Sequence, residues 1–305
     1  MIRKIYRALA NKKQKIVRSM KKKVPVYIPV LQSNLLKGRC ALITGGTRGI
    51  GFEIAKAYLK AGASVIVTGH SQERITKACE DLKQFCEDDS IVSGVVLDNT
   101  DCDSFDNKFE EVLKLAGERK IDILVNNAGV NGLSQFGKIT AEDYDKTLNT
   151  NLRGAFMLSQ VVAKYMKENK VQGNILNICS SSSLRPAVTP YTLSKWGLRG
   201  LTLGLAKTLI PYGIVVNGLA PGATATEMLV KDGYDGIELD SNPSGRFAEP
   251  VEMANMAVVL VSPLCRMAVG NILYMTGGGR TDYLRRYNIR LLIGNMTLAS
   301  NKETA

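Results

Sequence analysis

Tyr191 and Lys195 stand four residues apart in the segment PYTLSKWG, residues 190–197. Pro190 suits the entry of a helix, and the residues after Trp196 continue a helical pattern. Two side chains at this spacing share one helix face, one turn apart. The pair therefore places a phenol beside an ammonium group. An isolated pair of this kind is most often an exposed tyrosine and a solvated lysine, so the rest of the chain has to decide whether it does chemistry.

A glycine-rich turn, residues 44–51 (TGGTRGIG), separates a short apolar run from an amphipathic segment. In this strand–turn–helix setting Gly45 allows the tight turn and Gly49 lets the backbone approach a pyrophosphate. Gly51 permits close packing of the helix on the strand. The free N–H groups and the positive dipole end of the helix would face the phosphates. The turn therefore predicts a dinucleotide site.

The end of the second apolar run bears on which dinucleotide is bound. An NAD site of this type usually has an acidic residue about 20 residues after the turn, at the end of the second strand. Here residues 67–72 read VTGHSQ, and Glu73 falls in the first turn of a helix that Ser71 can cap. Arg48 is placed to pair with a 2′-phosphate, with His70 and Ser71 beside it. We therefore expect NADP.

Cysteine and histidine are too scattered for a zinc site or a histidine-activated nucleophile. The six cysteines form no Cys-x-x-Cys pair, and His70 is the only histidine. Neither a resident metal nor a Ser-His or Cys-His mechanism is expected. Scattered cysteines of this kind are typical of a reduced, cytoplasmic protein without disulfides.

The elements that would position these residues form one α/β domain. Short apolar runs alternate with segments of helical spacing such as 50–61 and 73–85. Runs rich in Val, Ile and Leu on both faces are typical of a parallel sheet covered by helices on each side. The seven runs are residues 40–45, 64–69, 92–98, 121–127, 173–179, 213–220 and 270–278. We predict a Rossmann-type, doubly wound, seven-stranded α/β sheet in a single domain.

The domain boundaries are predicted at residues 37–282, after an N-terminal extension of residues 1–36 and before a C-terminal tail of residues 283–305. No transmembrane span is expected, because glycine and proline interrupt the longest uncharged run, residues 208–226.

The segment 223–248 is long and carries glycines, which predicts a lid over the substrate.

The positive charge of the chain is concentrated in the N-terminal extension. Residues 1–39 contain 12 of the 40 basic residues and none of the 28 acidic ones, so the rest of the chain is charge-balanced. No nucleic-acid partner is therefore expected for the main domain. Within residues 1–23, apolar side chains occupy one side of a helix and most basic ones the other, which predicts peripheral contact with an anionic membrane surface. Packing of the apolar stripe on the enzyme or a neighbouring subunit is an equal alternative, and a mitochondrial transit peptide is a weaker one.

Five motifs, in this order, resemble those of the short-chain dehydrogenases/reductases. They are TGGTRGIG (44–51), NNAG (126–129), the serine cluster (180–183), YTLSK (191–195) and APG (220–222). The similarity covers residues 37–280, and the strands also look like those of 3-oxoacyl-acyl-carrier-protein reductases. The resemblance implies an NADP-dependent enzyme that transfers a hydride between nicotinamide and a ketone or secondary alcohol. It also implies a homotetramer or homodimer.

The resemblance further implies the roles of the catalytic residues. Tyr191 would protonate the forming alkoxide during reduction. Lys195 would hold the nicotinamide ribose and favour the tyrosinate. Asn151 matches the asparagine that positions a proton-relay water.

A serine near the end of the fifth strand should, by the same resemblance, hydrogen-bond the substrate carbonyl. The usual spacing of about 13 residues before the tyrosine falls on Ile178, where no serine stands. Aligning the strand selects Ser180 and a following loop two residues shorter than usual, with Ser182 as the alternative.

Further positions would line the cofactor. Asp98 and Asn99 match the adenine edge and residues 126–129 the ribose side. Pro221-Gly222 would shape the loop beneath the nicotinamide, with Thr226 at its carboxamide. The cofactor-binding residues expected are Gly45, Thr47, Arg48, Gly49, Ile50, Gly51, His70, Ser71, Asp98, Asn99, Asn127, Ala128, Gly129, Tyr191, Lys195, Pro221, Gly222 and Thr226.

The leading functional hypothesis is NADP(H)-dependent reduction of a ketone or oxidation of a secondary alcohol, with a 3-oxoacyl thioester among the candidate substrates. The alternatives are a sugar, polyol or steroid-like ketone as substrate, and a non-catalytic dinucleotide-binding regulator on the same fold.

Overall fold

The computed structural model describes residues 34–86, 90–132, 135–226 and 237–279. The predictions made for residues 1–23 and for the tail at 283–305 lie outside these residues, as does the middle of the expected lid. No helix of the described residues has the length and apolarity needed to cross a bilayer.

Seven parallel strands form one sheet in the order β3-β2-β1-β4-β5-β6-β7. The strands are β1 (Cys40–Ile43), β2 (Ser64–Gly69), β3 (Val92–Val96), β4 (Ile123–Asn126), β5 (Asn174–Ile178), β6 (Val215–Pro221) and β7 (Ile272–Met275). Each strand falls on one of the seven apolar runs, with β6 extending one residue past its run, so the prediction of a doubly wound sheet is confirmed. β1 is hydrogen-bonded to both β2 and β4, and the chain reverses its direction of travel across the sheet at this point.

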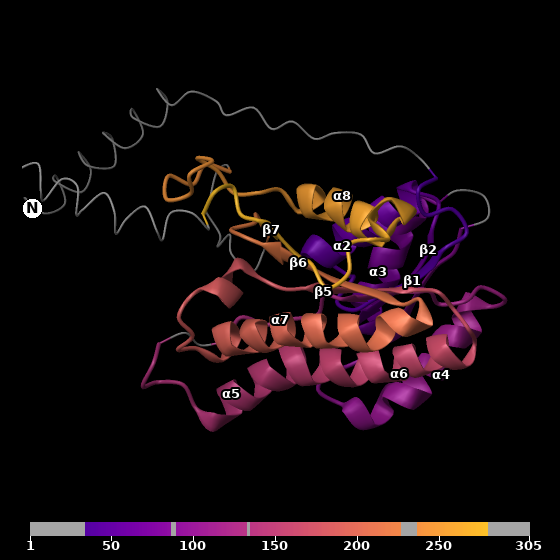
Figure 1. Ribbon diagram of the computed structural model, residues 1–305, viewed down its shortest axis with the longest axis horizontal. Helices are drawn as coiled ribbons and strands as arrows, with labels where there is room; N and C mark the ends of the chain where they lie inside the picture. Colours follow the sequence, from indigo (N-terminus) through magenta and orange to yellow (C-terminus); the bar gives the residue numbers. More distant parts are fainter. Residues whose placement is uncertain (1–33, 87–89, 133–134, 227–236, 280–305) are drawn as a thin grey trace, which may run out of the picture.

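Helices cover both faces of the sheet (Figure 1). One layer consists of α2 (Gly49–Lys60), α3 (Gln72–Lys83) and α8 (Pro250–Val261). The other contains α4 (Phe105–Ala116), α5 (Ala141–Leu148), α6 (Gly154–Glu168) and α7 (Pro190–Leu209). The predicted helices at 50–61 and 73–85 correspond to α2 and α3.

Two hydrophobic cores lie on opposite faces of the sheet because neighbouring residues of a strand point to opposite sides. Ile43 and Val67 pack into the core beneath α2 and α8. Leu42 and Ile66 pack into the core beneath α4 and α6. All four side chains are fully buried, and each such aliphatic group contributes about 1.5–3 kcal/mol of transfer free energy. The central strands are therefore held rigidly, with their carboxyl ends at one edge of the molecule.

α5 continues into α6 without a loop. Residues Asn149–Arg153 form one wider turn with π-helical hydrogen bonding, and Gly154 begins α6. Turns of this kind insert one extra residue into a helix and occur often at functional sites. Here the turn points the side chain of Asn151 toward the loop that follows β4, with which it bonds.

Candidate active site

The glycine turn between β1 and α2 has the conformation that the sequence predicts. Gly45 and Gly49 have φ angles of +63° and +58°, a region that favours glycine. A Cβ on Gly51 would lie 2.4 Å from both the Gly45 carbonyl oxygen and the Asn127 Nδ2 atom. Gly51 is therefore required for packing within the turn, whereas Gly45 and Gly49 are required for its backbone path.

Thr44 and Asn127 fasten the glycine turn to the end of β4. The Thr44 hydroxyl accepts hydrogen bonds of 3.0 Å from the backbone N–H groups of Asn127 and Ala128. The Asn127 side-chain amide donates to the carbonyls of Thr44 (2.9 Å) and Gly45 (3.0 Å). The Asn127 side chain thus supports the turn from below. Thr44 was not among the predicted site residues, although its position directly before the first glycine is a signal that could have identified it.

The N-terminus of α2 is left without a side-chain cap. Its N-cap residue, Arg48, is extended and makes no capping hydrogen bond, and the first turn contains no acidic residue. The first four N–H groups of a helix have no partner within the helix. They lie at the positive end of the helix dipole. A phosphate suits these donors. The turn and the helix start therefore fit a dinucleotide.

Charged and polar side chains gather where β2 and β3 end, at the predicted adenine side. His70 Nδ1 lies 3.9 Å from a carboxylate oxygen of Asp98. Partial burial raises the pKa of Asp98, but hydrogen bonds from the Thr100 N–H and hydroxyl, together with His70, lower it to below its usual value. Asn99 is buried against Gly154, where a Cβ would lie 2.2 Å from its carbonyl oxygen. Asp98 is the member of this set that remains exposed as an anion.

Ser71 is occupied as the cap of α3. Its side chain accepts a 3.4 Å hydrogen bond from the Arg74 N–H, and Glu73 stands in the first turn, as predicted. No acidic residue ends β2, whose last residue is Gly69. The ribose-binding acid usual in NAD sites is therefore missing from its position in this structure.

α7 begins at the tyrosine–lysine pair and is firmly capped. Thr189 accepts a bond from the Thr192 N–H, and the Thr192 side chain bonds back to the Thr189 N–H, with Pro190 as the first helical residue. This capping box orders the first turn of the helix, on which Tyr191 stands. Tyr191 and Lys195 share one face, with the Lys195 Nζ atom 5.8 Å from the centre of the Tyr191 ring.

Lys195 joins α7 to the end of β5. Its side chain is 5% exposed, and its Nζ atom donates a 2.8 Å hydrogen bond to the carbonyl oxygen of Ile178. Ile178 is the last residue of β5, and Ser180 follows two residues later. The bond therefore brings the tyrosine–lysine face to the start of the serine cluster.

Ser180 is nearly buried and has an oriented hydroxyl. Its Oγ atom accepts a 3.1 Å hydrogen bond from the Ser182 N–H at the start of a short 3₁₀ turn, Ser181–Leu184. No acceptor among the described residues takes the Ser180 hydroxyl proton, which is therefore available to a carbonyl oxygen. The alternative serine, Ser182, contributes its backbone N–H to this bond.

Asn151 is fixed by three hydrogen bonds. Its Oδ1 atom accepts from the Val130 N–H (2.8 Å), and its Nδ2 atom donates to the Val130 carbonyl (2.9 Å) and to Ser194 Oγ (3.1 Å). Ser194 in turn donates to the Tyr191 carbonyl at 2.8 Å. Because Ser194 and Asn151 are buried, this chain of bonds ties the π-helical turn to the first turn of α7. Sequence reasoning missed Ser194, which lies inside the YTLSK motif.

A buried polar cluster lies below the site. Asn126 Nδ2 donates to Ser159 Oγ (2.9 Å) and Asn177 Oδ1 (2.8 Å), and Asn177 donates to Thr202 Oγ1 (2.9 Å). The Asn126 Oδ1 atom is buried without a partner among the described residues. Asn126 therefore belongs to the support beneath the NNAG segment. Gly129, at the end of that segment, passes close to Asn151: a Cβ on Gly129 would lie 3.3 Å from Asn151 Oδ1.

The end of β6 packs closely against the end of β7 and the residue that follows it. Pro221 is buried, and a Cβ on Gly222 would lie 2.8 Å from the Thr276 Cα atom. Thr226 Cγ2 lies 3.7 Å from the ideal Cβ position of Gly49. Thr226 thus lies beside the glycine turn, at the distance of a van der Waals contact.

The described arms of the expected lid are held near α8. Thr224 and Ala248 form a parallel bridge, and Arg246 makes a two-pronged ion pair with Glu252 at 2.7 and 2.9 Å. The hydrogen bond from Arg246 lowers the pKa of Glu252, outweighing its partial burial. A hollow of about 300 Å³ lies between this arm and β7.

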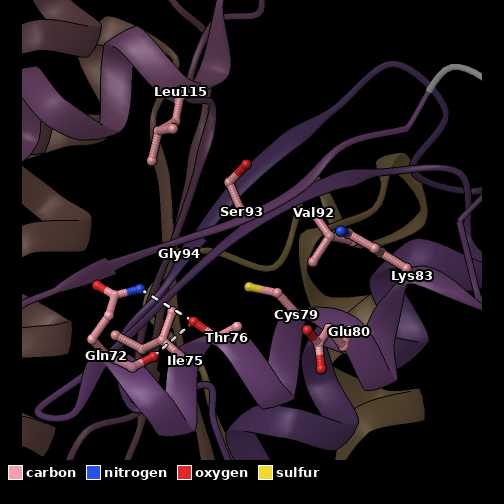
Figure 2. A pocket seen from close by; sticks show the side chains of 10 residues that line it. All are labelled: Gln72, Ile75, Thr76, Cys79, Glu80, Lys83, Val92, Ser93, Gly94 and Leu115. Carbon is pink, nitrogen blue, oxygen red and sulfur yellow. Dashed lines mark hydrogen bonds between the residues drawn. The ribbon is translucent and has the colours of Figure 1, made fainter.

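A separate hollow of about 290 Å³ lies between α3 and the edge strand β3 (Figure 2). Its lining residues include Cys79, Ser93 and Leu115, and it contains none of the residues predicted for the site. The residues that can do chemistry meet instead at the carboxyl ends of β1, β4, β5 and β6, the edge where ligands bind in open α/β sheets.

Known proteins show the same organisation. A family model described as short chain dehydrogenase matches residues 39–235. A 3alpha-hydroxysteroid dehydrogenase from Mediterraneibacter gnavus is 36% identical over 251 residues, which cover 81% of this chain and 99% of that protein. A 3-oxoacyl-[acyl-carrier-protein] reductase from Aquifex aeolicus is 35% identical over 251 residues, covering 80% and 98%.

A solved structure is similar over nearly its whole length. It is a gluconate 5-dehydrogenase from Burkholderia cenocepacia, in complex with NADP and tartrate. The TM-score is 0.72 at 30% sequence identity, and the match covers 82% of this chain and 98% of that one.

Proposed function

This chain belongs to the short chain dehydrogenase family, and from that premise we propose that it reduces a ketone, or oxidises the matching secondary alcohol, with NADP(H) and through Tyr191. Its membership makes it an NAD(P)-dependent oxidoreductase of small molecules, and the resemblance inferred from the five sequence motifs is confirmed. The residue roles, the preference for NADP and the substrate class are the proposal.

The assignment of the chemical step rests above all on the Lys195–Ile178 hydrogen bond. It supports a common site for Tyr191, Lys195 and Ser180, because it draws the capped start of α7 to the end of β5. The bound nicotinamide would supply or accept the hydride. Ser180 would donate its hydroxyl proton to the substrate carbonyl as a hydrogen bond and so orient it.

Tyr191 would give its phenolic proton to the carbonyl oxygen as that oxygen becomes a hydroxyl group. Lys195 would stabilise the resulting tyrosinate as a nearby cation and would bind the cofactor ribose with its remaining N–H donors. Asn151 would act beside them through the π-helical turn, whose shape its side chain fixes. In the oxidation direction the same groups would act in reverse.

Three observations support NADP over NAD. Arg48 lies in the glycine turn next to the uncapped start of α2. The end of β2 offers His70 and Ser71 where an NAD site usually has an acid. A similar solved enzyme holds NADP. Asp98 lies beside His70 in this region, and its pairing with His70 would moderate its repulsion of a 2′-phosphate.

Three substrate classes follow from the relatives: a 3-oxoacyl thioester, a sugar or polyol ketone, and a steroid-like ketone. We place the 3-oxoacyl thioester first because the sequence motifs resemble that subgroup. The test follows NADPH absorbance with acetoacetyl-coenzyme A, 5-keto-D-gluconate and a 3-ketosteroid as probes. Turnover of one probe, with a strong preference for NADPH over NADH, is expected. Equal kcat/KM for the two cofactors would contradict the NADP assignment, and failure of all three probes would contradict the substrate classes.

We also propose a homo-oligomer, as the family resemblance implies. Large apolar side chains on the outer side of α6 and α7 support it, because Phe156, Trp196 and Leu203 are each at least 40% exposed. Light scattering at micromolar concentration is expected to give a dimer or tetramer. A stable monomer would refute the proposal.

Residues 1–23 lie outside the described residues, and we propose on their sequence alone that they bring a cytoplasmic enzyme to an anionic membrane surface. The full chain is expected to sediment with anionic vesicles, less so at high salt, whereas a chain starting at Leu35 should not. If both chains ignore the vesicles, the membrane proposal fails. If the shorter chain also loses its oligomeric state or its activity, the segment belongs to the folded assembly instead.

A further inference from the structure

The serine cluster contains a second buried hydroxyl whose bonds differ from those of Ser180. Ser183 is fully buried, and its Oγ atom donates a 2.7 Å hydrogen bond to the carbonyl oxygen of Ser180. The hydroxyl of Tyr274 lies 3.3 Å from the same Oγ atom. Ser183 and Tyr274 are 91 residues apart in the chain, so this contact links the loop after β5 to the last strand of the sheet.

The direction of these bonds follows from the number of protons. A serine hydroxyl has one proton to donate and two lone pairs to accept with. Ser183 gives its proton to the Ser180 carbonyl, so Tyr274 must be the donor in its contact with Ser183. The result is a directed chain from the Tyr274 hydroxyl through Ser183 to the backbone of Ser180.

The far end of this chain is rigid. Tyr274 lies in β7 opposite Ala220 of β6, and its ring packs against the small cluster formed by Ala155, Cys179, Leu198 and Ala220. A side chain held by a paired strand and a packed cluster has little freedom, so its hydroxyl offers a fixed point. The loop has a further tether at its other end, where Trp196 Nε1 donates a 2.8 Å bond to the Arg185 carbonyl.

We propose that Tyr274 and Ser183 are positioning residues that hold the turn carrying Ser180, so that the Ser180 hydroxyl faces the same point as Tyr191. The inference deepens the proposed function and rests on its assignment of Ser180. It gives the consecutive serines separate tasks: Ser180 meets the carbonyl, the Ser182 N–H orients the Ser180 hydroxyl, and Ser183 fixes the Ser180 backbone.

The test compares Tyr274→Phe and Ser183→Ala with a matched control, Tyr58→Phe. Tyr58 is also buried, and its hydroxyl donates a 3.3 Å bond to the Ala257 carbonyl in the core beneath α2 and α8. All three changes remove one hydroxyl, which belongs to a buried residue at Ser183 and Tyr58 and to a partly buried one at Tyr274, but only the first two remove it from the proposed anchor. The control therefore reports what the loss of a buried hydroxyl does to the protein in general.

The first measurement is hydrogen–deuterium exchange of the peptide spanning residues 180–185, which requires no substrate. Faster exchange is expected in Tyr274→Phe and in Ser183→Ala, with no change in Tyr58→Phe. The double variant should exchange like either single variant, because both changes cut the same chain of bonds. Exchange in Tyr274→Phe and Ser183→Ala no different from that in the wild type would overturn the anchor, whatever the activity.

The second measurement uses the probe ketone with the highest kcat/KM in the wild type. Both anchor variants should lose roughly tenfold in kcat/KM, less than the ~10²-fold that a misplacement of about 1 Å can cost. The NADPH dissociation constant should be unchanged, and the primary isotope effect with deuterated NADPH should rise. A merely structural loss lowers the active fraction and leaves KM and the isotope effect unaltered, so that pattern would refute the positioning role. Altered exchange together with a wild type that reduces none of the probes would support the anchor and reject the proposed function.

Discussion

Two helices begin at the same edge of the sheet, and their first turns are built in opposite ways. α2 starts at Gly49 after an extended Arg48 that makes no capping bond, and its first turn contains no acidic side chain. α7 starts at Pro190 with a reciprocal cap between Thr189 and Thr192. Each start follows a strand of the same parallel sheet. One helix start has no side-chain cap, and in the other a side chain accepts a bond from a backbone N–H of the first turn.

The difference separates two ways of using a helix. Omitting a cap costs a helix about 0.5–2 kcal/mol, and at α2 that cost leaves N–H groups available to a phosphate. At α7 the cap stabilises the first turn, so the side chains of Tyr191 and Lys195 are held in place. α2 is therefore suited to bind with its backbone, while α7 is suited to react with its side chains. Substitutions in the two turns should have separable effects.

The largest effect is expected from Tyr191→Phe in the capped turn. The ring remains, but the proton donor is lost, so kcat should fall by ~10²–10⁴. Binding of NADPH, measured by its fluorescence, should stay close to that of the wild type. Tyr212→Phe, which changes an exposed tyrosine beyond the other end of α7, is the control and should be silent. Wild-type turnover by Tyr191→Phe would show that Tyr191 of α7 is not the proton donor.

Arg48→Ala should act on the uncapped turn with the next largest effect. Loss of a charge-assisted bond of about 1.5–3 kcal/mol corresponds to roughly 10- to 100-fold weaker NADPH binding. NADH binding should hardly change because NADH lacks the 2′-phosphate. Lys164→Ala removes an exposed positive charge on α6 and controls for net charge. If NADPH and NADH binding were weakened equally, Arg48 would not bind the 2′-phosphate.

Gly51→Ala should disturb the uncapped turn through packing. Its Cβ would approach the Gly45 carbonyl to 2.4 Å, and overpacking of this kind costs about 1–3 kcal/mol. Lower thermal stability and roughly tenfold weaker NADPH binding are expected. Gly204→Ala, in a part of α7 where a Cβ meets no atom within 4 Å, should instead raise stability by roughly 0.5–1 kcal/mol. Unchanged binding by Gly51→Ala would mean that the turn tolerates displacement.

The smallest effect is expected from Thr189→Ala, which removes the cap of α7. Stability should fall by about 1 kcal/mol, and kcat should fall several-fold because the first turn of α7 carries Tyr191. Thr140→Ala removes the equivalent cap of α5 and should cost similar stability without lowering kcat. If the two variants lost kcat equally, the cap of α7 would have no special relation to the reaction.

Most of the fold could be predicted from the sequence because its strands are apolar on both faces. A buried parallel strand leaves a continuous run of Val, Ile and Leu, and all seven runs contain a strand in the structure. The glycine turn and the tyrosine–lysine pair were equally visible, since both depend on neighbours within one turn. The wide turn at Asn149–Arg153 was not, because π-helical geometry leaves no clear signal in residue types.

Contacts between distant segments account for what the sequence could not reveal. Asn126 and Asn127 look alike in the motif NNAG, yet their side chains have different partners. Asn126, the last residue of β4, bonds within the buried cluster, whereas Asn127, directly after the strand, bonds to the glycine turn. Ser183 is the last of four consecutive serines, and nothing in its spacing points to Tyr274. Ser194 was passed over because its partners, Asn151 and the Tyr191 carbonyl, become neighbours only when α7 packs on the π-helical turn.

The amide pair Asn126–Asn177 has a consequence for how the chain folds. The two residues are direct partners in the β4–β5 register, and parallel strands rich in Val, Ile and Leu offer little else to distinguish one alignment from the next. A slip by two residues would set Asn126 against Ile175 and bury both amides without each other, at a cost of about 1–3 kcal/mol for each unsatisfied group. The pair thus favours the observed alignment of β4 and β5 over a slip by two residues.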